Sequence, residues 1–520
     1  MKRIGIDVGG TNTDAVLIEG GRVLRGVKTP TTEDVTGGVR TALAELLQGD
    51  AALSASVDAV MIGTTHFTNA VVQRRGLNRV GALRIGLPAS ASLPPFVDWP
   101  ADLAALVRGQ VVLVEGGHEY DGRPIVPLDR KAIRAAARRF ADQGLSAVAV
   151  SSVFSPLTPE CEAAAAEILA EEIPGARITL SHELGRIGLL ERENVALLNA
   201  CLQDMAQRTS RAFTDALADS GIAAPLYITQ NDGTITLAGQ AERFPVYCFA
   251  SGPTNSMRGA VFLSGIEDGV VVDVGGTTSD IGYLKHGFPR EANAAVEVGG
   301  VRTLFRMPDL LSIGLGGGTE IDPDSRAIGP GSVGYRLTRE ALVFGGRQLT
   351  ATDVAVAAGV AEIGDPQRVA GLDRAMVGAV LEAMHAMIVE GIDRMKTEAG
   401  DVPLIAVGGG SFLIPDRVEG ASEVVRVEHH AVANAVGAAI AQVSGEVDQI
   451  FSGLGRDRSI EEARAQAERR ALEAGAAAGS LKTVEVEDLP LAYLPGDSLR
   501  VRVRVIGDIA TPAEAVAAAG

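Results

Sequence analysis

One eight-residue pattern occurs twice in this chain and constrains its fold more than any other feature. It reads Asp-Val-Gly-Gly-Thr-x-[Thr/Ser]-Asp and covers residues 7–14 and 273–280. An apolar run stands on each side of both copies, so each copy predicts two strands joined by a tight glycine turn. For a single copy, a hairpin whose aspartates cap the turn would be explanation enough. Two copies indicate a duplicated domain with one such turn in each half.

The pattern has the chemical features of a phosphate-binding turn. Its glycines leave backbone N–H groups exposed, and the threonines add hydroxyl donors. A buried carboxylate is costly unless it is paired or metal-bound, and Mg²⁺ prefers one or two carboxylates with waters and phosphate oxygens. We therefore expect the two halves to close on a nucleotide, with Asp7 and Asp273 as catalytic residues that hold Mg²⁺ and its waters. Asp14 and Asp280 are expected to brace the turns.

Three glycine-rich segments are expected to bind the nucleotide. The third, residues 408–410, ends a strand and is expected to contact the nucleoside. The sequence contains no G-x-x-x-x-G-K-[ST] loop, and the first two glycine pairs precede a second strand instead of opening a helix. A P-loop and a dinucleotide-binding fingerprint are therefore excluded. The residues expected to bind ATP are Gly9, Gly10, Thr11, Asn12, Gly275, Gly276, Thr277, Thr278, Gly408, Gly409 and Gly410.

Bulk composition limits the class of protein. With 520 residues the chain is too long for one core, and its net charge of −18 disfavours a nucleic-acid partner. The three cysteines are widely spaced and lack a CxxC pairing, which favours buried reduced thiols. We find neither a signal peptide nor a run of about 18 apolar residues. We expect a cytoplasmic protein without a membrane partner.

The pattern of predicted elements indicates an α/β protein. Strands alternate with amphipathic helices over most of the chain, as in α/β folds. The character changes after residue 445, where a charged, alanine-rich helix at 456–479 precedes two alternating segments at 482–493 and 499–509. We expect a small C-terminal α+β appendage. Its strands form either a self-contained sheet or an edge on which a partner could pair.

The ordered series of motifs resembles the acetate and sugar kinase/Hsp70/actin superfamily. More narrowly, it resembles the hydantoinase/oxoprolinase family, in its ATP-dependent subunit of the hydantoin utilization protein A type. The resemblance extends from about Lys2 to Val443. It rests on "IGIDVGGTNTDAVL", "IGTTHFTNAVVQRRG", "ERENVALLNACL", "FPVYCFASGPTNSMRGA", "VVVDVGGTTSDIGYL", "LLSIGLGGGTEID", "GGRQLTATDVAVAAG" and "LIAVGGGSF".

This resemblance implies a fold and a domain order. The fold would be two duplicated actin/ribonuclease H-like lobes around a nucleotide cleft, followed by the small appendage. The implied domains are an N-terminal lobe at 1–178, a core lobe at 179–445 that carries the second phosphate loop and the adenosine motif, and the appendage at 446–520.

The resemblance also implies an activity. The protein would be an ATP-dependent cyclic amidohydrolase that phosphorylates the carbonyl oxygen of a hydantoin, oxoproline or related lactam, with ATP and Mg²⁺ as cofactors. Many relatives work with a hydrolytic partner and carry a longer C-terminal domain, so we expect a second subunit in a hetero-oligomer. Two alternatives stay open, which are a small-molecule kinase of the same superfamily and a non-catalytic, nucleotide-gated binding protein.

A histidine loop is the candidate substrate site. Thr64, Thr65 and His66 follow a predicted strand, and the resemblance places this loop near the cleft. A capping role for His66 explains the pattern equally well. The pair His429-His430 lacks further ligands at metal-binding spacing, which disfavours a zinc site.

Two acidic pairs follow glycine or threonine. Glu320 and Asp322 could close over the phosphates or belong to a tight hairpin. Thr350 and Asp353 fit a helix N-cap with an acidic first turn, which requires no catalytic role.

Overall fold

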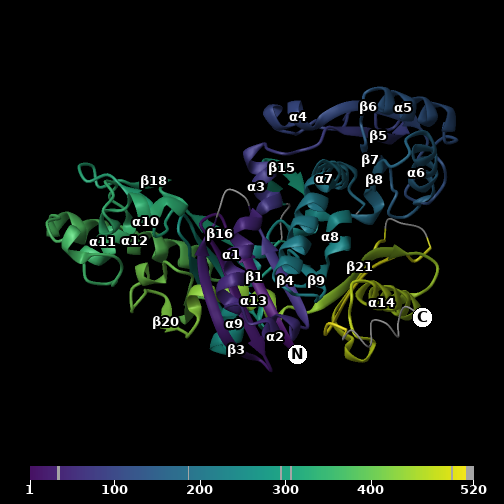
Figure 1. Cartoon of the computed structure of the whole chain (residues 1–520). Coiled ribbons are helices and arrows are strands. Elements are labelled where there is room, and N and C mark those ends of the chain that lie inside the picture. Colours follow the sequence, from purple (N-terminus) through teal and green to yellow (C-terminus); the bar gives the residue numbers. More distant parts are fainter. Residues whose placement is uncertain (32–34, 186, 293–295, 305–306, 493–495, 511–520) are drawn as a thin grey trace.

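A computed structural model of the chain (Figure 1) describes residues 1–31, 35–185, 187–292, 296–304, 307–492 and 496–510. Two large sheets form two lobes, and a smaller four-stranded unit lies beside the first lobe. The helices are α1 (Val35–Leu47), α2 (Ala51–Ala55), α3 (His66–Gln73), α4 (Ala101–Val107), α5 (Arg130–Asp142), α6 (Glu160–Glu172), α7 (Leu189–Asp219), α8 (Ala238–Arg243), α9 (Ser251–Ser264), α10 (Leu337–Glu340), α11 (Ala351–Ala357), α12 (Arg374–Met395), α13 (Ala433–Ile440) and α14 (Arg456–Glu473).

The first lobe is built on a nine-stranded sheet in the order β22-β23-β21-β10-β9-β4-β1-β2-β3. Its strands are β1 (Lys2–Val8), β2 (Asn12–Glu19), β3 (Arg22–Pro30), β4 (Ala59–Thr64), β9 (Leu226–Thr229), β10 (Ile235–Leu237), β21 (Val443–Phe451), β22 (Lys482–Pro490) and β23 (Leu499–Gly507). Strands β1 and β2 form the expected antiparallel hairpin, and β1 pairs in parallel with β4. The hairpin therefore lies within the sheet, with its turn at the end where β4 also finishes.

The second lobe repeats this arrangement in a six-stranded sheet, with order β13-β12-β11-β19-β20 and β16 paired to β12. Its strands are β11 (Gly269–Val274), β12 (Ser279–Lys285), β13 (Phe288–Pro289), β16 (Leu310–Ile313), β19 (Val402–Val407) and β20 (Ala421–Arg426). Strands β11 and β12 form the second hairpin, and β11 pairs in parallel with β19. The predicted duplication is confirmed, because each hairpin has a parallel strand on the same side.

The C-terminal segment has the expected α+β character, but its strands do not form a separate sheet. Strand β23 pairs with β21 and β22, and β21 pairs with β10 of the first lobe. Helix α14 packs on the buried valines of β23 and on β21. The appendage, yellow in Figure 1, therefore extends the first sheet and leaves β22 at its edge. The domain limits at 178/179 and 445/446 stay a prediction.

A four-stranded parallel sheet, order β6-β5-β7-β8, forms the smaller unit. Helices α5 and α6 cover it through a separate core that includes Phe140 and Ile168. Two short hairpins complete the described strands. The bounds are β5 (Val80–Leu87), β6 (Arg108–Glu115), β7 (Ala147–Ser152), β8 (Arg177–Leu180), β14 (Val296–Val298), β15 (Val301–Thr303), β17 (Thr319–Ile321) and β18 (Ile328–Ser332).

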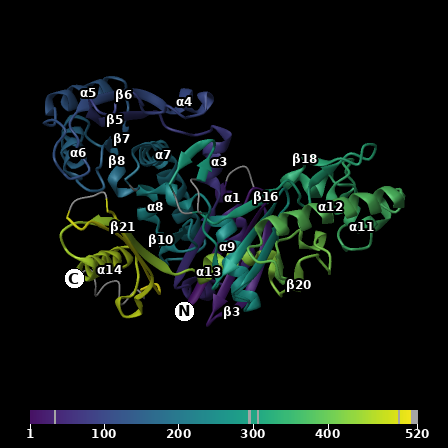
Figure 2. The same cartoon turned by 180° about the vertical axis from the view of Figure 1, so that it is seen from behind.

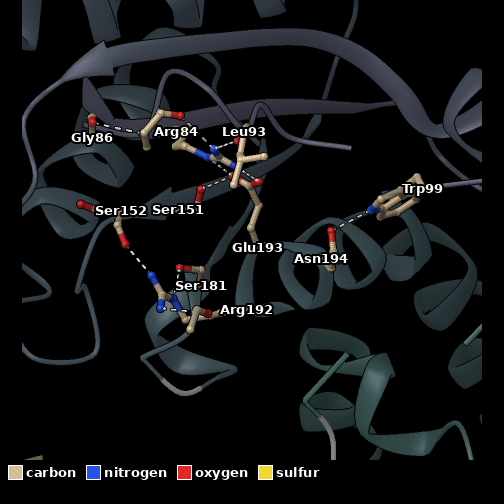
Figure 3. A network of polar contacts seen from close by, with 12 residues as sticks. Arg84, Gly86, Leu93, Trp99, Ser151, Ser152, Ser181, Arg192, Glu193 and Asn194 are labelled. Carbon is tan, nitrogen blue, oxygen red and sulfur yellow. Dashed lines mark hydrogen bonds and ion pairs between the residues drawn. The ribbon is translucent and has the colours of Figure 1, made fainter. Parts of the chain in front are cut away.

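A buried polar network joins this unit to helix α7 (Figure 3). Arg84 of β5 forms an ion pair with Glu193 of α7, and the two side chains are 0% and 4% exposed. Ser151 Oγ of β7 donates a second hydrogen bond to Glu193 Oε1, at 2.5 Å. Arg192 donates to Ser181 Oγ at 2.9 Å. Consecutive charged residues at the start of α7 therefore hold the four-stranded unit in place.

The next residue of α7 connects three segments. Asn194 Oδ1 accepts a hydrogen bond from Trp99 Nε1 at 2.8 Å, and Asn194 Nδ2 donates to the carbonyl oxygen of Arg302 in β15 at 3.0 Å. The motif "ERENV" thus supplies the charged and polar side chains of a joint between the four-stranded unit, α7 and the β14–β15 hairpin.

Helices α9 and α13 cross between the two large sheets (Figure 2). A Cβ built on Gly259 would lie 1.9 Å from the carbonyl oxygen of Ala433, and one on Gly437 would lie 1.8 Å from that of Asn255. Only glycine permits this backbone approach. The small residues of the two helices therefore let their backbones come into direct contact.

Helix α12 differs from the expectation that the chain has no long apolar segment. By length and composition it could span a membrane, with a mean hydropathy of 1.5. One face of it, including Val380, Met384 and Ile388, is buried in the core of the second lobe. A core helix passes the same test of length and composition. The expected cytoplasmic location stays a prediction.

Candidate functional site

The two glycine turns stand in equivalent places in the two lobes. Asp7 pairs with Asp14 across the β1–β2 hairpin, and Asp273 pairs with Asp280 across the β11–β12 hairpin. The two Asp-Val-Gly-Gly-Thr copies therefore share one register, with an acidic pair at the base of each turn.

The turns are closed by matching backbone hydrogen bonds, and they lie against each other. Gly9 N donates to Asn12 O at 3.0 Å, and Gly275 N donates to Thr278 O at 2.9 Å. A Cβ built on Gly276 would lie 2.8 Å from Thr11 Cγ2. The sequence predicted that the turns would face one nucleotide, and the structure brings them into contact across the lobes.

The carboxylate of Asp7 is buried at the junction of the lobes. The residue is 4% exposed, and Oδ1 has no hydrogen-bond partner among the residues that the structure describes. Oδ2 accepts a hydrogen bond of 3.4 Å from Nδ2 of Asn434, at the start of α13. Burial raises the pKa of Asp7 to about 7, and the charge of Asp14 adds to the shift. A buried oxygen without a partner is a place where a cation is favourable.

The other three acidic residues have different surroundings. Asp14 accepts two hydrogen bonds of 2.6 Å from Nζ of Lys28, which lies opposite it on β3. Burial raises the pKa of Asp273, and burial followed by the charge of Asp273 raises the pKa of Asp280 to about 6. The site thus holds four carboxylates and, in Lys28, a cation beside one of them.

These carboxylates fit one divalent ion better than a larger metal centre. In the described part of the chain, no group of three or more His, Cys, Asp or Glu side chains is arranged to hold a metal. Mg²⁺ needs only one or two carboxylates when phosphates and waters supply its other ligands. The partnerless Oδ1 of Asp7 suits this role.

The third glycine run packs directly on the second turn. A Cβ on Gly408, where φ is +87°, would lie 2.2 Å from Asp273 Oδ1. Gly410 N donates to Val274 O at 2.8 Å. Gly409, which lies between them, is exposed. Close packing therefore requires glycine at 408 and 410, and the contact of residues 408–410 with the nucleoside stays a prediction.

A fourth glycine run also contacts the second turn. Gly317 N donates to Gly275 O at 3.0 Å, and Gly318 N donates to Gly276 O at 2.7 Å. Glu320 lies on β17 of a short hairpin. Asp322 accepts hydrogen bonds from two backbone N–H groups of its own turn. The tight-hairpin interpretation holds for the two acids, and the glycines support the turn.

Thr64 and Thr65, two of the candidate substrate residues, follow the residue of β4 that pairs with Asp7. Strand β4 ends at Thr64, and its neighbour Gly63 pairs with Asp7. A Cβ on Gly252 would lie 3.4 Å from Thr65 Cγ2 and 3.8 Å from Asp7 Oδ1. His66 is the first residue of α3, and burial together with Arg208 lowers its pKa.

Two further candidates have structural roles. His430 Nδ1 lies 2.9 Å from the carbonyl oxygen of Val427. The backbone carbonyl oxygen of His430 accepts a hydrogen bond from Gly408 N at 3.0 Å. Thr350 and Asp353 form the expected N-cap of α11, as a complete capping box.

Comparisons with known proteins identify the family of the chain. Two consecutive family models match, the hydantoinase/oxoprolinase N-terminal region over residues 3–173 and the hydantoinase/oxoprolinase model over residues 192–365. Together they cover well over half of the chain. It belongs to the hydantoinase/oxoprolinase family.

Curated relatives include members of two kinds of enzyme. The chain is 26% identical over 473 residues to the caprolactamase subunit alpha of Pseudomonas jessenii, which covers 79% of this chain and 65% of the relative. It is 28% identical over 405 residues to the acetophenone carboxylase gamma subunit of Aromatoleum aromaticum, covering 69% and 53%. This hydantoinase/oxoprolinase family member thus spans less than two thirds of these relatives.

Solved structures share the fold of this family member. The ATP-dependent caprolactamase of Pseudomonas jessenii has a TM-score of 0.78 at 20% identity, covering 98% of this chain and 88% of that one. Nucleotide-free acetone carboxylase has a TM-score of 0.71 at 18% identity, covering 98% and 89%. The expected two-lobed α/β fold is confirmed.

Sequence reasoning did not assign two residues of the site. Asn434 is the polar residue in a helix of small and apolar residues, and this could have marked it as a candidate site residue. Lys28 could have been found only from the register of the β2–β3 hairpin, because it lies outside every quoted motif.

Proposed function

We propose that this member of the hydantoinase/oxoprolinase family is the ATP-using subunit of a cyclic-amide hydrolase. The observation that carries the proposal is the contact between two equivalent turns, each with a buried or partly buried aspartate at its base. Such paired turns from opposite lobes suit a nucleotide held between them. The similarity to a caprolactamase subunit supports a lactam as the second substrate.

The proposed reaction makes an unreactive carbonyl reactive. The ring carbonyl oxygen attacks the terminal phosphorus of ATP, and the bond between that phosphorus and ADP breaks. Water then attacks the ring carbon, and the C–N bond opens as its nitrogen takes up a proton, which leaves an open-chain acyl phosphate. A second water attacks the acyl carbon, and phosphate leaves with the former carbonyl oxygen. The products are an open-chain amino or carbamoyl acid, ADP and phosphate. The protein has little covalent chemistry to perform, so its residues position the reactants and stabilise charge.

In this proposal each turn holds phosphate through its backbone N–H groups. Asp7 and Asp273 would hold Mg²⁺ and its waters, while Asn434 keeps the Asp7 carboxylate oriented. When bound, Mg²⁺ neutralises phosphate charge during transfer. Thr64, Thr65 and His66 would line the lactam site next to Asp7. The predicted contacts of phosphate and nucleoside with residues 9–12, 275–278 and 408–410 belong to the same proposal.

A second subunit is part of the proposal. Both curated relatives are named as subunits. The described residues contain no cluster of three or more metal ligands for a hydrolytic step. Strand β22 is a sheet edge with Val484 and Val486 each over 40% exposed, which offers a surface for the partner. We expect the isolated chain to open rings poorly and a hetero-oligomer to be the active form.

One further function has direct support. The similarity to an acetophenone carboxylase gamma subunit favours a role in the carboxylation of a ketone as the alternative. A ketone and a lactam share a carbonyl oxygen, so the same lobes could serve either. The small-molecule kinase and the nucleotide-gated binding protein remain outcomes of the test.

The test follows the carbonyl oxygen. The chain, co-expressed with the product of a neighbouring reading frame, is incubated with Mg²⁺, ATP and lactams or hydantoins labelled with ¹⁸O at the carbonyl. We expect ring opening with ¹⁸O in the released phosphate. Ring opening with unlabelled phosphate would contradict this route, in which phosphate leaves with the former carbonyl oxygen. A stable phosphorylated product would identify a kinase, and phosphate release that ignores every substrate would identify a binding protein. Turnover of a ketone only with bicarbonate would identify a carboxylase.

A further inference from the structure

Lys28 is a basic side chain held among the carboxylates of the site. It lies on β3 directly opposite Asp14 of β2, and its Nζ is 2.6 Å from both carboxylate oxygens. Burial raises the pKa of Asp7, Asp14 and Asp273, and the charge of Lys28 opposes the shift in all three. The charge of Lys28 therefore acts on acidic residues of both lobes and not only on Asp14, its direct partner.

The same side chain reaches the opposite lobe. Its Cε lies 3.7 Å from the position that a Cβ on Gly409 would occupy. Gly409 is exposed in the loop after β19, and the Lys28 side chain is 29% exposed. Lys28 thus starts on a strand of the first lobe and ends beside the third glycine run of the second lobe.

The ammonium group has capacity for another ligand. A lysine ammonium has three N–H donors, and two hydrogen bonds go to Asp14 in the described structure. A triphosphate in this acidic site would be repelled by the carboxylates unless cations neutralise it. Lysine is a compact point charge that binds phosphate well.

We propose that Lys28 binds a phosphate oxygen of the nucleotide, with Asp14 positioning its ammonium group. This inference rests on the proposed nucleotide function. Lys28 would add a cation from the first lobe to the phosphate contacts of the glycine turns. Asp14, which we expected only to brace its turn, would hold Lys28 in place.

A simpler role must be separated from this one, because Lys28 could serve only as the counterion of Asp14. The decisive variant is the double substitution Asp14→Asn/Lys28→Met, which removes the cation without leaving a buried charge unpaired. Lys28→Met alone and Lys28→Arg complete the series. Lys396→Met is the matched control, because Lys396 Nζ makes one hydrogen bond, to Gly420 O, at 2.9 Å and in the second lobe.

Binding is measured by calorimetry with ATP, ADP, AMP and adenosine, each with and without Mg²⁺, and thermal unfolding confirms that each variant is folded. We expect the double variant to bind ATP about 10- to 100-fold more weakly than the wild type, as for loss of a hydrogen bond to a charged group. Adenosine affinity should be unchanged, Lys28→Arg should recover part of the ATP affinity, and Lys396→Met should match the wild type.

Each other outcome has a defined meaning. If the double variant binds ATP as tightly as the wild type, Lys28 is only a counterion and the inference is wrong. If affinity for adenosine falls as much as affinity for ATP, Lys28 does not contact phosphate, which also overturns it. A wild-type protein that binds no ATP would instead overturn the proposed nucleotide function itself.

Discussion

Gly276 of the second turn lies against Thr11 of the first, so that a Cβ at position 276 would be 2.8 Å from Thr11 Cγ2. This contact joins the lobes at the point where we place the phosphates. Gly276→Val should force the turns apart and weaken ATP binding about tenfold or more, because a branched side chain cannot occupy this space. Calorimetry measures the effect. Gly378→Val is the control, since Gly378 lies on α12 with open space around its Cβ position.

Gly10 gives a different test of the same turns. No protein atom lies within 4 Å of a Cβ at this position, and the residue is exposed. Gly10→Val should therefore leave the melting temperature within about 2 °C of the wild type, as surface substitutions usually do. ATP affinity should still fall, because the side chain would meet a phosphate instead of protein. Unchanged ATP affinity in this folded variant would remove the first turn from the nucleotide site.

The stability of the ligand-free protein should depend on the protonation of Asp7. Burial, with a smaller effect of Asp14, raises the pKa of Asp7 from 3.8 to about 7. The folded state holds this proton more tightly than the unfolded state, so the stabilising contribution is complete below pH 3.8 and is lost as the pH rises through about 7. The rise of the pKa from 3.8 to about 7 sets an upper limit of about 4 kcal/mol on this contribution to the free energy of unfolding.

The variant Asp7→Asn isolates this effect from other titrating groups. In buffers with a chelator, its melting temperature relative to the wild type should rise between about pH 5 and about pH 8, because only the wild type loses stability there through Asp7. Asp416→Asn, at a carboxylate 94% exposed, is the control and should show no such trend. A flat difference for Asp7→Asn would mean that Asp7 titrates normally.

The joint between α7 and the four-stranded unit should be sensitive to loss of one charge. Arg84 and Glu193 are both buried, so Glu193→Gln leaves the guanidinium without its counterion. We expect a loss of about 3–5 kcal/mol in the free energy of unfolding, as for other broken buried pairs. Glu171→Gln, at the exposed pair with Arg134, should cost less than about 1 kcal/mol. Chemical denaturation compares the two, and similar losses would show that the buried pair contributes little.

The sequence predicted the parts of this site that depend on local pattern. The two hairpins, their glycine turns and the acidic residues at their bases follow from one repeated motif, and their equivalent registers confirm it. The small residues of α13 suit tight packing against another helix, which here is α9. Its partner could not be named, because the contact joins residues that are distant in the sequence.

The remaining features depend on tertiary arrangement. The segments that form β22 and β23 alternate apolar and polar residues, as a small independent sheet would. Only the pairings of β23 with β21 and of β21 with β10 show that they extend the first lobe. Lys28 contacts Asp14 because β2 and β3 pair in that register. Asn434 contacts Asp7, which lies 427 residues earlier in the sequence. Local patterns contain no information about such contacts.

The central claim is that the two turns form a site for ATP with Mg²⁺. The most direct measurement is calorimetric titration of ATP, with Mg²⁺ or with a chelator, into the wild type, Asp7→Asn, Asp273→Asn and the control Asp416→Asn. We predict that Mg²⁺ strengthens ATP binding in the wild type and the control, and that each variant at Asp7 or Asp273 loses most of this gain while staying folded. Equal Mg²⁺-dependent binding in all four proteins would contradict the account.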